Sequence, residues 1–367
     1  MANRSRMGLL LDRSYIYGKT LKYCVNKSKY AKKRIKMIGG GYKGSRKEFK
    51  DIVLEFWKPY GIRPERYWYT LYCAREDSYD PRYIPDNIWF GKIYPYFNNI
   101  IARNSYADKG FFDTLFADLK RPGTVIKNMA GYYYDEEMKL LSKEEAIEKC
   151  LGAEHWVIKA STNTGGGKSI QFFDISGEND REKIERLFSD YKVNFIVQNL
   201  VEQHPDLAKI HEKSLNTVRV QSFFFKGKVY ILSAQLRMGS GESRLDNVSS
   251  GGCACAIGED GWLKGKAVTR KSEWTDHHES GIYFKDVKVP SYDKILDIVN
   301  KRHPQLPYFG IIGWDFAVDK DGDPVFIEIN ATSEPNQIAS GPTFGDLTKE
   351  VLQEVFVDKT MENYFIN

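Results

Sequence analysis

Apolar and polar residues alternate along much of the chain after its first third, and short apolar runs lie between clusters of turn-forming residues. Both patterns are typical of β-strands. Strands are predicted for residues 124–127, 156–159, 169–173, 194–201, 217–225, 228–237, 252–257, 313–319 and 324–330. Short turns such as Lys226-Gly227 join several of these segments, which favours antiparallel hairpins.

Apolar positions spaced three and four residues apart predict helices between these strands and early in the chain. The helices are predicted for residues 49–57, 111–119, 142–150, 181–191 and 291–301. Ser142 and Glu145 have the spacing of a capping box, and the Pro- and Tyr-rich stretch 63–96 is predicted to be irregular. Because strands and helices alternate without regular βαβ spacing, the predicted fold class is α+β with mostly antiparallel sheets.

Changes in this pattern divide the 367-residue chain into three regions. A mostly helical N-terminal region covers residues 1–105, and two α+β regions cover residues 106–198 and 199–367. No apolar run reaches the length needed to cross a bilayer, and the first residues lack a signal-peptide core, so a cytoplasmic location is expected. The five cysteines include no CxxC pair and are predicted to be reduced, buried thiols.

Positive charge is concentrated between residues 19 and 50, although the net charge of the whole chain is only +5. This stretch carries many lysines and arginines against a single acid, Glu48. The favoured interpretation is a solvated helix face. The alternative is a surface for an anionic partner, such as a phosphorylated sugar carrier or a membrane face with which the protein associates peripherally. The stretch lacks the aromatic interleaving of nucleic-acid modules, so no nucleic-acid partner is expected.

The last two predicted strands form a hairpin that carries a metal site. Asp321-Gly322 predicts a two-residue turn between them. A turn centred there places Asp315 directly opposite Glu328, and Asn330 shares the face of Glu328. An ordinary hairpin with exposed acids is the alternative, but the apolar neighbours of both acids favour a bound cation. Two carboxylates and an amide oxygen suit Mg²⁺, or Mn²⁺ in its place, that also binds phosphate oxygens.

A glycine-rich segment, Thr164-Gly-Gly-Gly-Lys-Ser169, joins two of the predicted strands. It resembles the end of a Walker A motif, but Thr162 stands where that motif requires a glycine, and a strand follows instead of a helix. A glycine-rich hairpin can still fold its N–H groups over phosphates, although any tight hairpin can use glycines. The phosphate-binding candidates here are Lys159, Gly165, Gly166, Gly167, Lys168 and Ser169.

Two arginines lie on adjacent predicted strands that are otherwise rich in apolar residues. Arg219 belongs to Asn216-Thr-Val-Arg-Val, and Arg237 belongs to Ala234-Gln-Leu-Arg-Met. Either arginine alone would be interpreted as a solvated residue on a sheet surface. Together they suit bidentate binding of a phosphate or a carboxylate.

The order of these elements resembles that of the ATP-grasp superfamily. The lysine and its glycine loop come first, the arginines and Asn247 with a glycine pair follow, and the metal hairpin comes last. The segment around Asn247 looks like that of the ligases that add glutamate to a ribosomal protein. Within the superfamily, segments 124–128, 197–204 and 214–219 look most like the sugar-transfer-associated ATP-grasp family, which is found with polysaccharide-synthesis genes. The resemblance covers roughly residues 105–350.

The resemblance implies an ATP-grasp fold, in which ATP is clasped between the two α+β regions. Lys159 would contact the phosphates and adenine, and the loop 164–169 would close over the phosphates. The hinge beside the adenine would consist of Gln198, Asn199, Leu200 and Val201, with Glu202 as a ribose partner. Gln198 replaces the acidic residue that is usual at this hinge. Lys109 resembles the earlier superfamily lysine that reaches the α-phosphate, and Lys127 competes for that role.

The resemblance also implies a reaction. A carboxylate would attack the γ-phosphate, and an amine would capture the resulting acyl phosphate, which gives an amide and ADP. Arg219, Arg237 and Asn247 would hold the γ-phosphate and the acyl phosphate. The chain is therefore interpreted as an ATP-dependent carboxylate–amine ligase of surface-polysaccharide synthesis. It would join an amino acid or another amine to a small-molecule or sugar-linked carboxylate.

Two alternatives stay open at this point. The first is an ATP-grasp phosphotransferase that stops after phosphorylating a sugar or another small molecule. The second is a nucleotide-binding module without turnover. The intact set of predicted lysines, arginines and metal ligands argues against the second alternative. Residues 1–105 are assigned to recognition of the acceptor.

Overall fold

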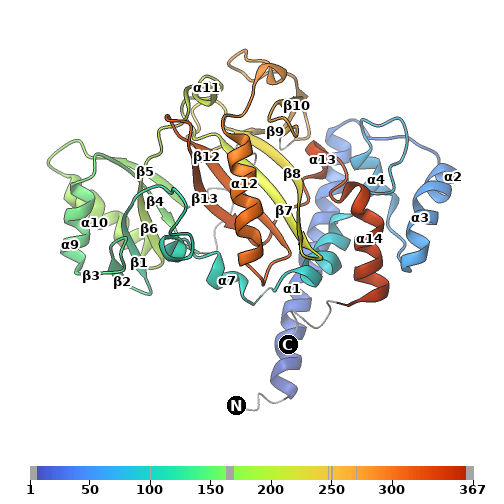
Figure 1. Ribbon diagram of the computed structural model, residues 1–367, viewed down its shortest axis with the longest axis horizontal. Helices are drawn as coiled ribbons and strands as arrows, with labels where there is room; N and C mark the ends of the chain where they lie inside the picture. Colours follow the sequence, from blue (N-terminus) through green and yellow to red (C-terminus); the bar gives the residue numbers. More distant parts are fainter. Residues whose placement is uncertain are drawn as a thin grey trace.

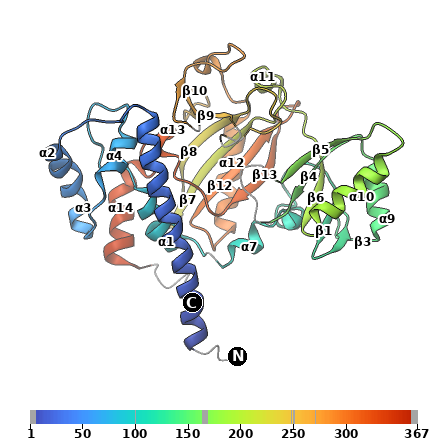
Figure 2. The ribbon, with the colours of Figure 1, turned by 180° about the vertical axis from the view of Figure 1, so that it is seen from behind.

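The computed structural model describes residues 6–99, 101–162, 169–246, 248, 251–269 and 271–360. A smaller sheet, a larger sheet and a helical region follow one another along the long axis of the molecule (Figure 1). The first helix runs along the helical region and projects beyond it, as the view from behind also shows (Figure 2). No helix in the described ranges is both long and apolar enough to cross a membrane.

The smaller, six-stranded sheet has the order β3-β2-β1-β6-β4-β5, and its neighbouring strands are antiparallel. Its strands are β1 (Thr124–Met129), β2 (Tyr132–Tyr134), β3 (Leu140–Leu141), β4 (His155–Ala160), β5 (Ile170–Asp174) and β6 (Phe195–Asn199). Helices α9 (Lys143–Leu151) and α10 (Asp180–Tyr191) pack on one face, around the buried Trp156. The predicted capping box of α9 is confirmed, because the side chains of Ser142 and Glu145 each accept from the other's backbone N–H.

The larger, seven-stranded sheet has the order β11-β10-β9-β8-β7-β12-β13 and is antiparallel throughout. Its strands are β7 (Thr217–Phe225), β8 (Lys228–Met238), β9 (Cys253–Ile257), β10 (Leu263–Thr269), β11 (Trp274–Thr275), β12 (Ile311–Val318) and β13 (Pro324–Asn330). Helix α12 (Tyr292–Arg302) covers one face, where Val218 and Trp314 belong to a common core. Side chains alternate along a strand, so Arg219 and Asp315 point to the opposite face.

The helical region combines the first part of the chain with its last described residues. Its helices are α1 (Arg6–Met37), α2 (Arg46–Glu48), α3 (Glu55–Trp57), α4 (Arg66–Tyr72), α5 (Asp86–Ile88), α6 (Tyr94–Phe97), α13 (Gln337–Ser340) and α14 (Thr348–Gln353). Side chains from both ends of the chain share its core, among them Trp57, Trp89, Phe344 and Leu352. The short α-helices α7 (Arg103–Tyr106), α8 (Phe112–Leu115) and α11 (Pro205–Ala208) lie outside this region.

The stretch 63–96 contains the helices α4 and α5 and part of α6, so the prediction of irregular structure there is wrong. Its prolines stand where helices tolerate them: Pro85 precedes α5, and Pro95 lies in the first turn of α6. Its aromatic side chains, such as Trp68 and Tyr69, are buried in the core of the helical region. Burial against distant parts of the chain therefore outweighs the local composition.

Helix α8 is shorter than the helix predicted for residues 111–119. The guanidinium of Arg121 donates to the carbonyl of Phe116 and, at 2.9 Å, to the carbonyl of Leu119. These two carbonyls therefore have hydrogen-bond partners without a continued helix. The cysteines agree with their prediction: none of the five forms a disulfide, and all except the half-buried Cys24 are buried.

The loop between β12 and β13 differs from the predicted two-residue turn. Val318 and Pro324 form the last pair of the hairpin. The loop is then closed by a hydrogen bond of 3.0 Å from the N–H of Asp319 to the carbonyl of Asp323. Gly322 has a φ of +83°, which fits the left-handed position of a three-residue hairpin loop.

The pairing of Asp315 with Glu328 is nevertheless as predicted. A bulge separates this pair from the next one, Phe316 with Phe326. Ile327 is the extra residue of β13 in this bulge and has no paired residue on β12. The longer loop alone would shift the register by one position, and the bulge compensates for that shift. The bulge therefore returns both carboxylates to one face of the sheet.

Asn98 joins the helical region to the strand that carries Asp315. Its Nδ2 donates to the carbonyl of Ile311 at 2.7 Å, and its Oδ1 accepts from the N–H of Ile311 at 2.9 Å. A further bond of 2.8 Å runs from Nδ2 to the hydroxyl of Tyr94. The Asn98 side chain is buried, so water cannot replace these partners.

We expect Asn98→Ala to lower the free energy of unfolding by about 2–4 kcal/mol, because it leaves buried polar groups of Ile311 without partners. Denaturation in urea measures this change. Asn300→Ala, at an exposed position on α12, is the matched control and should change the free energy by less than about 0.5 kcal/mol. Equal effects of the two variants would contradict the role assigned to Asn98.

Candidate active site

A cavity of about 540 Å³ lies between the two sheets. The smaller sheet contributes β4, β5 and the end of β6, and the larger sheet contributes β7, β8, β12 and β13. The segment after β6 runs from one sheet to the other. The predicted site residues that line it are Lys109, Lys159, Ser169, Gln198, Asn199, Leu200, Val201, Glu202, Arg219, Arg237, Asp315, Glu328 and Asn330. The other candidates at the loop and beyond β8 lie outside the described residues: Gly165, Gly166, Gly167, Lys168 and Asn247.

Asp315, Glu328 and Asn330 form an oxygen-rich group on the cavity face of the hairpin. The amide nitrogen of Asn330 lies 3.2 Å from a carboxylate oxygen of Asp315 and 3.2 Å from one of Glu328. The side chain of Asp315 is 1% exposed, whereas that of Glu328 is 26% exposed. Carboxylates and an amide carbonyl are the hard donors that Mg²⁺ and Mn²⁺ prefer.

This donor set fits a cation that arrives together with phosphate. Among the described residues, no group of three or more His, Cys, Asp or Glu side chains could hold a metal ion. The described side chains of the hairpin, two carboxylates and one amide, would leave part of the coordination shell of a cation open. Mg²⁺ commonly takes one or two carboxylates and completes its shell with water and substrate phosphates. The hairpin fits that arrangement.

Two arginines neutralise the buried Asp315. Arg219 pairs with Asp315 across β7 and β12, and both its Nε and its Nη2 donate to the carboxylate, the latter at 2.7 Å. Nη2 of Arg237, on β8, lies 3.2 Å from the same carboxylate. A guanidinium matches phosphate as well as carboxylate in shape. A cation that binds Asp315 would therefore free these arginines for a phosphate.

Thr217 and Asp246 position Arg237, and the sequence analysis assigned neither of them a role. The hydroxyl of Thr217 accepts from Arg237 at 2.7 and 3.0 Å and donates to the carboxylate of Asp246. Burial raises the pKa of Asp246, and the charge of Arg237 partly offsets that effect. For Thr217 the sequence contains one indication of such a role. Thr217 stands two residues before Arg219 and therefore points to the same face of the strand.

Arg244 also lacked a predicted role, and it links the two sides of the cavity. Its guanidinium carbon lies 3.9 Å from the ring centroid of Phe172, on β5. Both residues line the cavity, one from each side. A cation–π contact of this kind contributes about 0.5–2 kcal/mol to holding the two sides of the cavity together.

Lys109 and Lys159 bring positive charge to the cavity, across from the hairpin. Nζ of Lys109 lies 3.0 Å from a carboxylate oxygen of Glu328. Burial alone would raise the pKa of Glu328, but the charges of Lys109, Lys159 and Arg219 outweigh it and hold that pKa well below its usual range. Burial lowers the pKa of Lys159 to about 8, and the charge of Lys109 acts in the same direction. This concentration of cations suits a polyphosphate ligand.

The structure separates the two lysines that were candidates for the same contact. Lys109 lines the cavity, whereas Lys127 does not. Lys127 is fully buried, and its Nζ lies 2.9 Å from the carboxylate of Asp113 and 3.2 Å from the carbonyl of Glu136. A buried charge needs such partners. Lys127 therefore has a buried ion pair outside the cavity, and the assignment of the phosphate contact to Lys109 or Lys127 stays a prediction.

The predicted hinge segment is anchored at both of its ends. At the end of β6, the N–H of Asn199 donates to the carbonyl of Gly123 at 2.9 Å. At the other end, the carbonyl of Glu202 accepts from the N–H of Lys320 at 2.9 Å, and its carboxylate pairs with the ammonium of Lys320. The segment thus connects the smaller sheet to the loop between β12 and β13.

Residues 96–353 match the protein-family model described as sugar-transfer associated ATP-grasp. The match includes both sheets and the whole cavity, and the fold is the ATP-grasp fold. The chain therefore belongs to the sugar-transfer associated ATP-grasp family. A comparison with curated proteins gives no match.

Solved structures with a similar fold share little sequence with this chain. D-alanyl-alanine synthetase A from Vibrio cholerae is 14% identical, with a TM-score of 0.42 over 71% of this chain and 66% of that one. L-amino acid ligase from Bacillus licheniformis is 13% identical, with a TM-score of 0.40 over 71% and 49%. Biotin carboxylase from Campylobacter jejuni is 14% identical, with a TM-score of 0.43 over 70% and 48%. The chain spans less than two thirds of each of these proteins, and the family assignment rests on the family model alone.

The pKa of Lys159 predicts how binding of a polyphosphate such as MgATP depends on pH. Lys159 loses its charge as the pH rises through about 8, so we expect the affinity to fall about tenfold between pH 7 and pH 9. Calorimetric titration at both pH values measures the change. Lys159→Arg, which stays charged, should bind with nearly the same affinity at both. The same loss of affinity in Lys159→Arg would contradict this role of the lysine.

Proposed function

We propose that the chain is an ATP-dependent, ADP-forming carboxylate–amine ligase. One observation supports this most strongly: two carboxylates, an amide and two arginines converge on one face of the larger sheet, across from two lysines. Such a site can hold the phosphates of a nucleotide and neutralise charge on the group that is transferred. ATP with Mg²⁺, or with Mn²⁺ in its place, is the proposed nucleotide complex.

Some residues of the cavity bind the phosphates, and others neutralise the charge of the transferred group. Lys109 and Lys159 bind the phosphates from the side of the smaller sheet. Bound by Asp315, Glu328 and Asn330, Mg²⁺ would neutralise charge on the β- and γ-phosphates. Arg219 and Arg237 then hold the γ-phosphate, while the positioning residues Thr217 and Asp246 keep Arg237 in place.

The proposed reaction has two steps. An oxygen of the substrate carboxylate attacks the γ-phosphorus, and the bond from that phosphorus to the oxygen of the departing ADP breaks. The nitrogen of an amine then attacks the acyl carbon, the amine loses a proton, and inorganic phosphate leaves. Arg219 and Arg237 neutralise the negative charge of the phosphate in both steps, and the proposed reaction needs no protein nucleophile.

The proposed substrate is a sugar-linked or small-molecule carboxylate, joined to an amino acid or another amine in surface-polysaccharide synthesis. The description of the family as sugar-transfer associated supports this choice. A cytoplasmic site of action, where ATP is available, is part of the proposal.

Release of ADP should require both substrates. We expect turnover when hexuronic acids and amino acids are supplied together with MgATP, with an amide as the product. A coupled assay for ADP and mass spectrometry of the product measure this outcome. Complete ADP release without an amine, together with a stable phosphorylated product, would show a phosphotransferase instead.

Asp315→Asn and Glu328→Gln should each lower kcat by about 100-fold or more, because each weakens charge neutralisation at the transferred phosphate. Steady-state kinetics with MgATP measure the loss. Asp321→Asn removes an exposed carboxylate at the tip of the same hairpin and is the matched control, with unchanged kcat. Unchanged turnover in the first two variants would rule out the metal assignment.

A further inference from the structure

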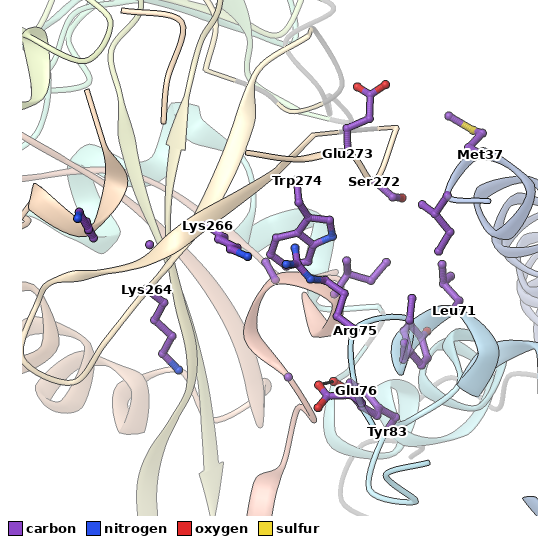
Figure 3. A pocket seen from close by; sticks show the side chains of 18 residues that line it. Met37, Leu71, Arg75, Glu76, Tyr83, Lys264, Lys266, Ser272, Glu273 and Trp274 are labelled. Carbon is purple, nitrogen blue, oxygen red and sulfur yellow. Dashed lines mark hydrogen bonds between the residues drawn. The ribbon is translucent and has the colours of Figure 1, made fainter. Parts of the chain in front are cut away.

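A second cavity, of about 820 Å³, lies where the helical region meets the edge of the larger sheet. Its walls come from the end of α1, from α4 and the turn after it, from β10 and β11, and from α13 (Figure 3). It shares no lining residue with the cavity between the sheets. Small-molecule sites typically enclose roughly 300–1,000 Å³, so this cavity has room for much more than a single ion.

The charged side chains of this cavity are mostly cationic. The cations are Arg75, Lys264, Lys266 and Lys285, and the carboxylates are Glu76 and Glu273. Within the described ranges, none of these four cations takes part in an ion pair, whereas Lys109 and Lys127 near the first cavity are both paired. Unpaired cations on a concave surface create a positive potential that attracts anions.

A bulge in β10 gives the two lysines of this strand their positions. The pairing of β9 with β10 changes register between Leu263 and Ala267. Gly265 lies inside this bulge with a φ of +77°, a conformation that favours glycine. Bulges redirect side chains and are frequent next to functional sites. Lys264 and Lys266 lie on the β10 side of the cavity (Figure 3).

Trp274 gives the cavity an aromatic surface. The guanidinium carbon of Arg75 lies 4.4 Å from the centroid of its ring, and the two side chains lie side by side on the wall of the cavity (Figure 3). Three buried hydrophobic residues extend the wall of the cavity beside Trp274, namely Leu71, Tyr72 and Tyr83. An aromatic surface gains dispersion contacts with the C–H groups of a sugar ring. An inorganic anion alone would gain no such contacts.

Trp274 lies in the same cross-strand row as Arg237, which belongs to the proposed active site. Ala254 pairs with Arg237 on one side and with Val268 on the other, and Val268 pairs with Trp274. Directly paired residues point to the same face of a sheet. Neighbouring strands are about 4.8 Å apart, so the backbones of Trp274 and Arg237 lie about 15 Å apart.

We propose that the second cavity binds an anionic sugar, which is the carbohydrate end of the substrate that the ATP site activates. The cations bind the carboxylate or phosphate of the sugar, and Trp274 packs against its ring. The row through Val268 and Ala254 puts this cavity and Arg237 on the same face of the sheet, about 15 Å apart. The link to catalysis rests on the proposed ligase function, whereas the binding site itself does not require it.

Calorimetric titration of the full chain without ATP tests the binding site independently of turnover. The probes are glucuronic acid, glucose 1-phosphate, glucose and inorganic phosphate. At least one of the two anionic sugars should bind about tenfold more tightly than either glucose or phosphate, because only an anionic sugar uses both the cations and the aromatic surface. The preference between the two anionic sugars then identifies the carboxylate or the phosphate as the recognised group.

Charge reversal at the cavity provides the matched comparison. Lys266→Glu and Arg75→Glu change exposed side chains, so they should fold normally and weaken binding of the anionic sugar by about tenfold or more. Lys301→Glu makes the same charge change at an exposed position of α12, outside the cavity, and should leave binding unchanged. The proposal is overturned if no probe binds, if phosphate binds as tightly as the anionic sugars, or if all three variants bind equally.

The two proposals can fail separately. If the anionic sugars bind with the expected pattern but the chain does not turn over MgATP with any carboxylate and amine, the ligase function is wrong and the sugar site stands. If turnover occurs with small carboxylates but no sugar binds, the inference about the second cavity is wrong and the ligase function stands.

Discussion

The buried carboxylate of Asp315 is the constraint on which the proposed active site depends. An isolated carboxylate in this position would cost several kcal/mol, because it is only 1% exposed and loses its contact with water. Arg219 compensates for this loss from β7, which neighbours the strand of Asp315, and Arg237 does so from β8, one strand further away. Because these charges are paired with one another, charged ligands can exchange for the partners of Asp315 and of the two arginines. A divalent cation at Asp315 and a phosphate at the arginines would replace one set of charge pairs with another.

The rest of the fold keeps this charge cluster on one face of one sheet. The opposite face of the larger sheet packs against α12 and supplies a core of apolar side chains. Alternation along each strand then directs Arg219, Arg237, Asp315 and Glu328 to the cavity. The smaller sheet supplies Lys159, and the helical region holds the start of β12 through Asn98. Packing on one face of the sheet thus determines which groups are available for chemistry on the other.

Much of this arrangement could be predicted, because it depends on local patterns. The strand alternation around Arg219 is encoded by the residues next to it. The hairpin of Asp315 and Glu328 is likewise encoded by a short, continuous segment. The pairing of these acids was predicted correctly although the turn was not, since the bulge at Ile327 compensates for the longer loop. The helical structure of residues 63–96 could not be predicted in this way, because it depends on aromatic burial against the far end of the chain.

The second cavity was not predictable for the same reason. Arg75 and Trp274 are almost 200 residues apart in the sequence, and only the packing of the helical region against β11 brings them together. The strands β10 and β11 were also missed, since their apolar positions are few and a bulge interrupts their alternation. Likewise, Thr217 and Asp246 became neighbours of Arg237 only through the register of β7 and β8 and the loop that follows β8.

Electron paramagnetic resonance of Mn²⁺ tests directly whether Asp315 and Glu328 hold a divalent cation beside ATP, since Mn²⁺ takes the same oxygen ligands as Mg²⁺ and reports its own coordination. We expect ATP and the wild-type chain together to bind Mn²⁺ tightly, with a spectrum that neither shows with Mn²⁺ alone. The double variant Asp315→Asn, Glu328→Gln should lose this signal. Equal binding of Mn²⁺ with ATP by the double variant and the wild-type chain would show that the two carboxylates do not hold the cation.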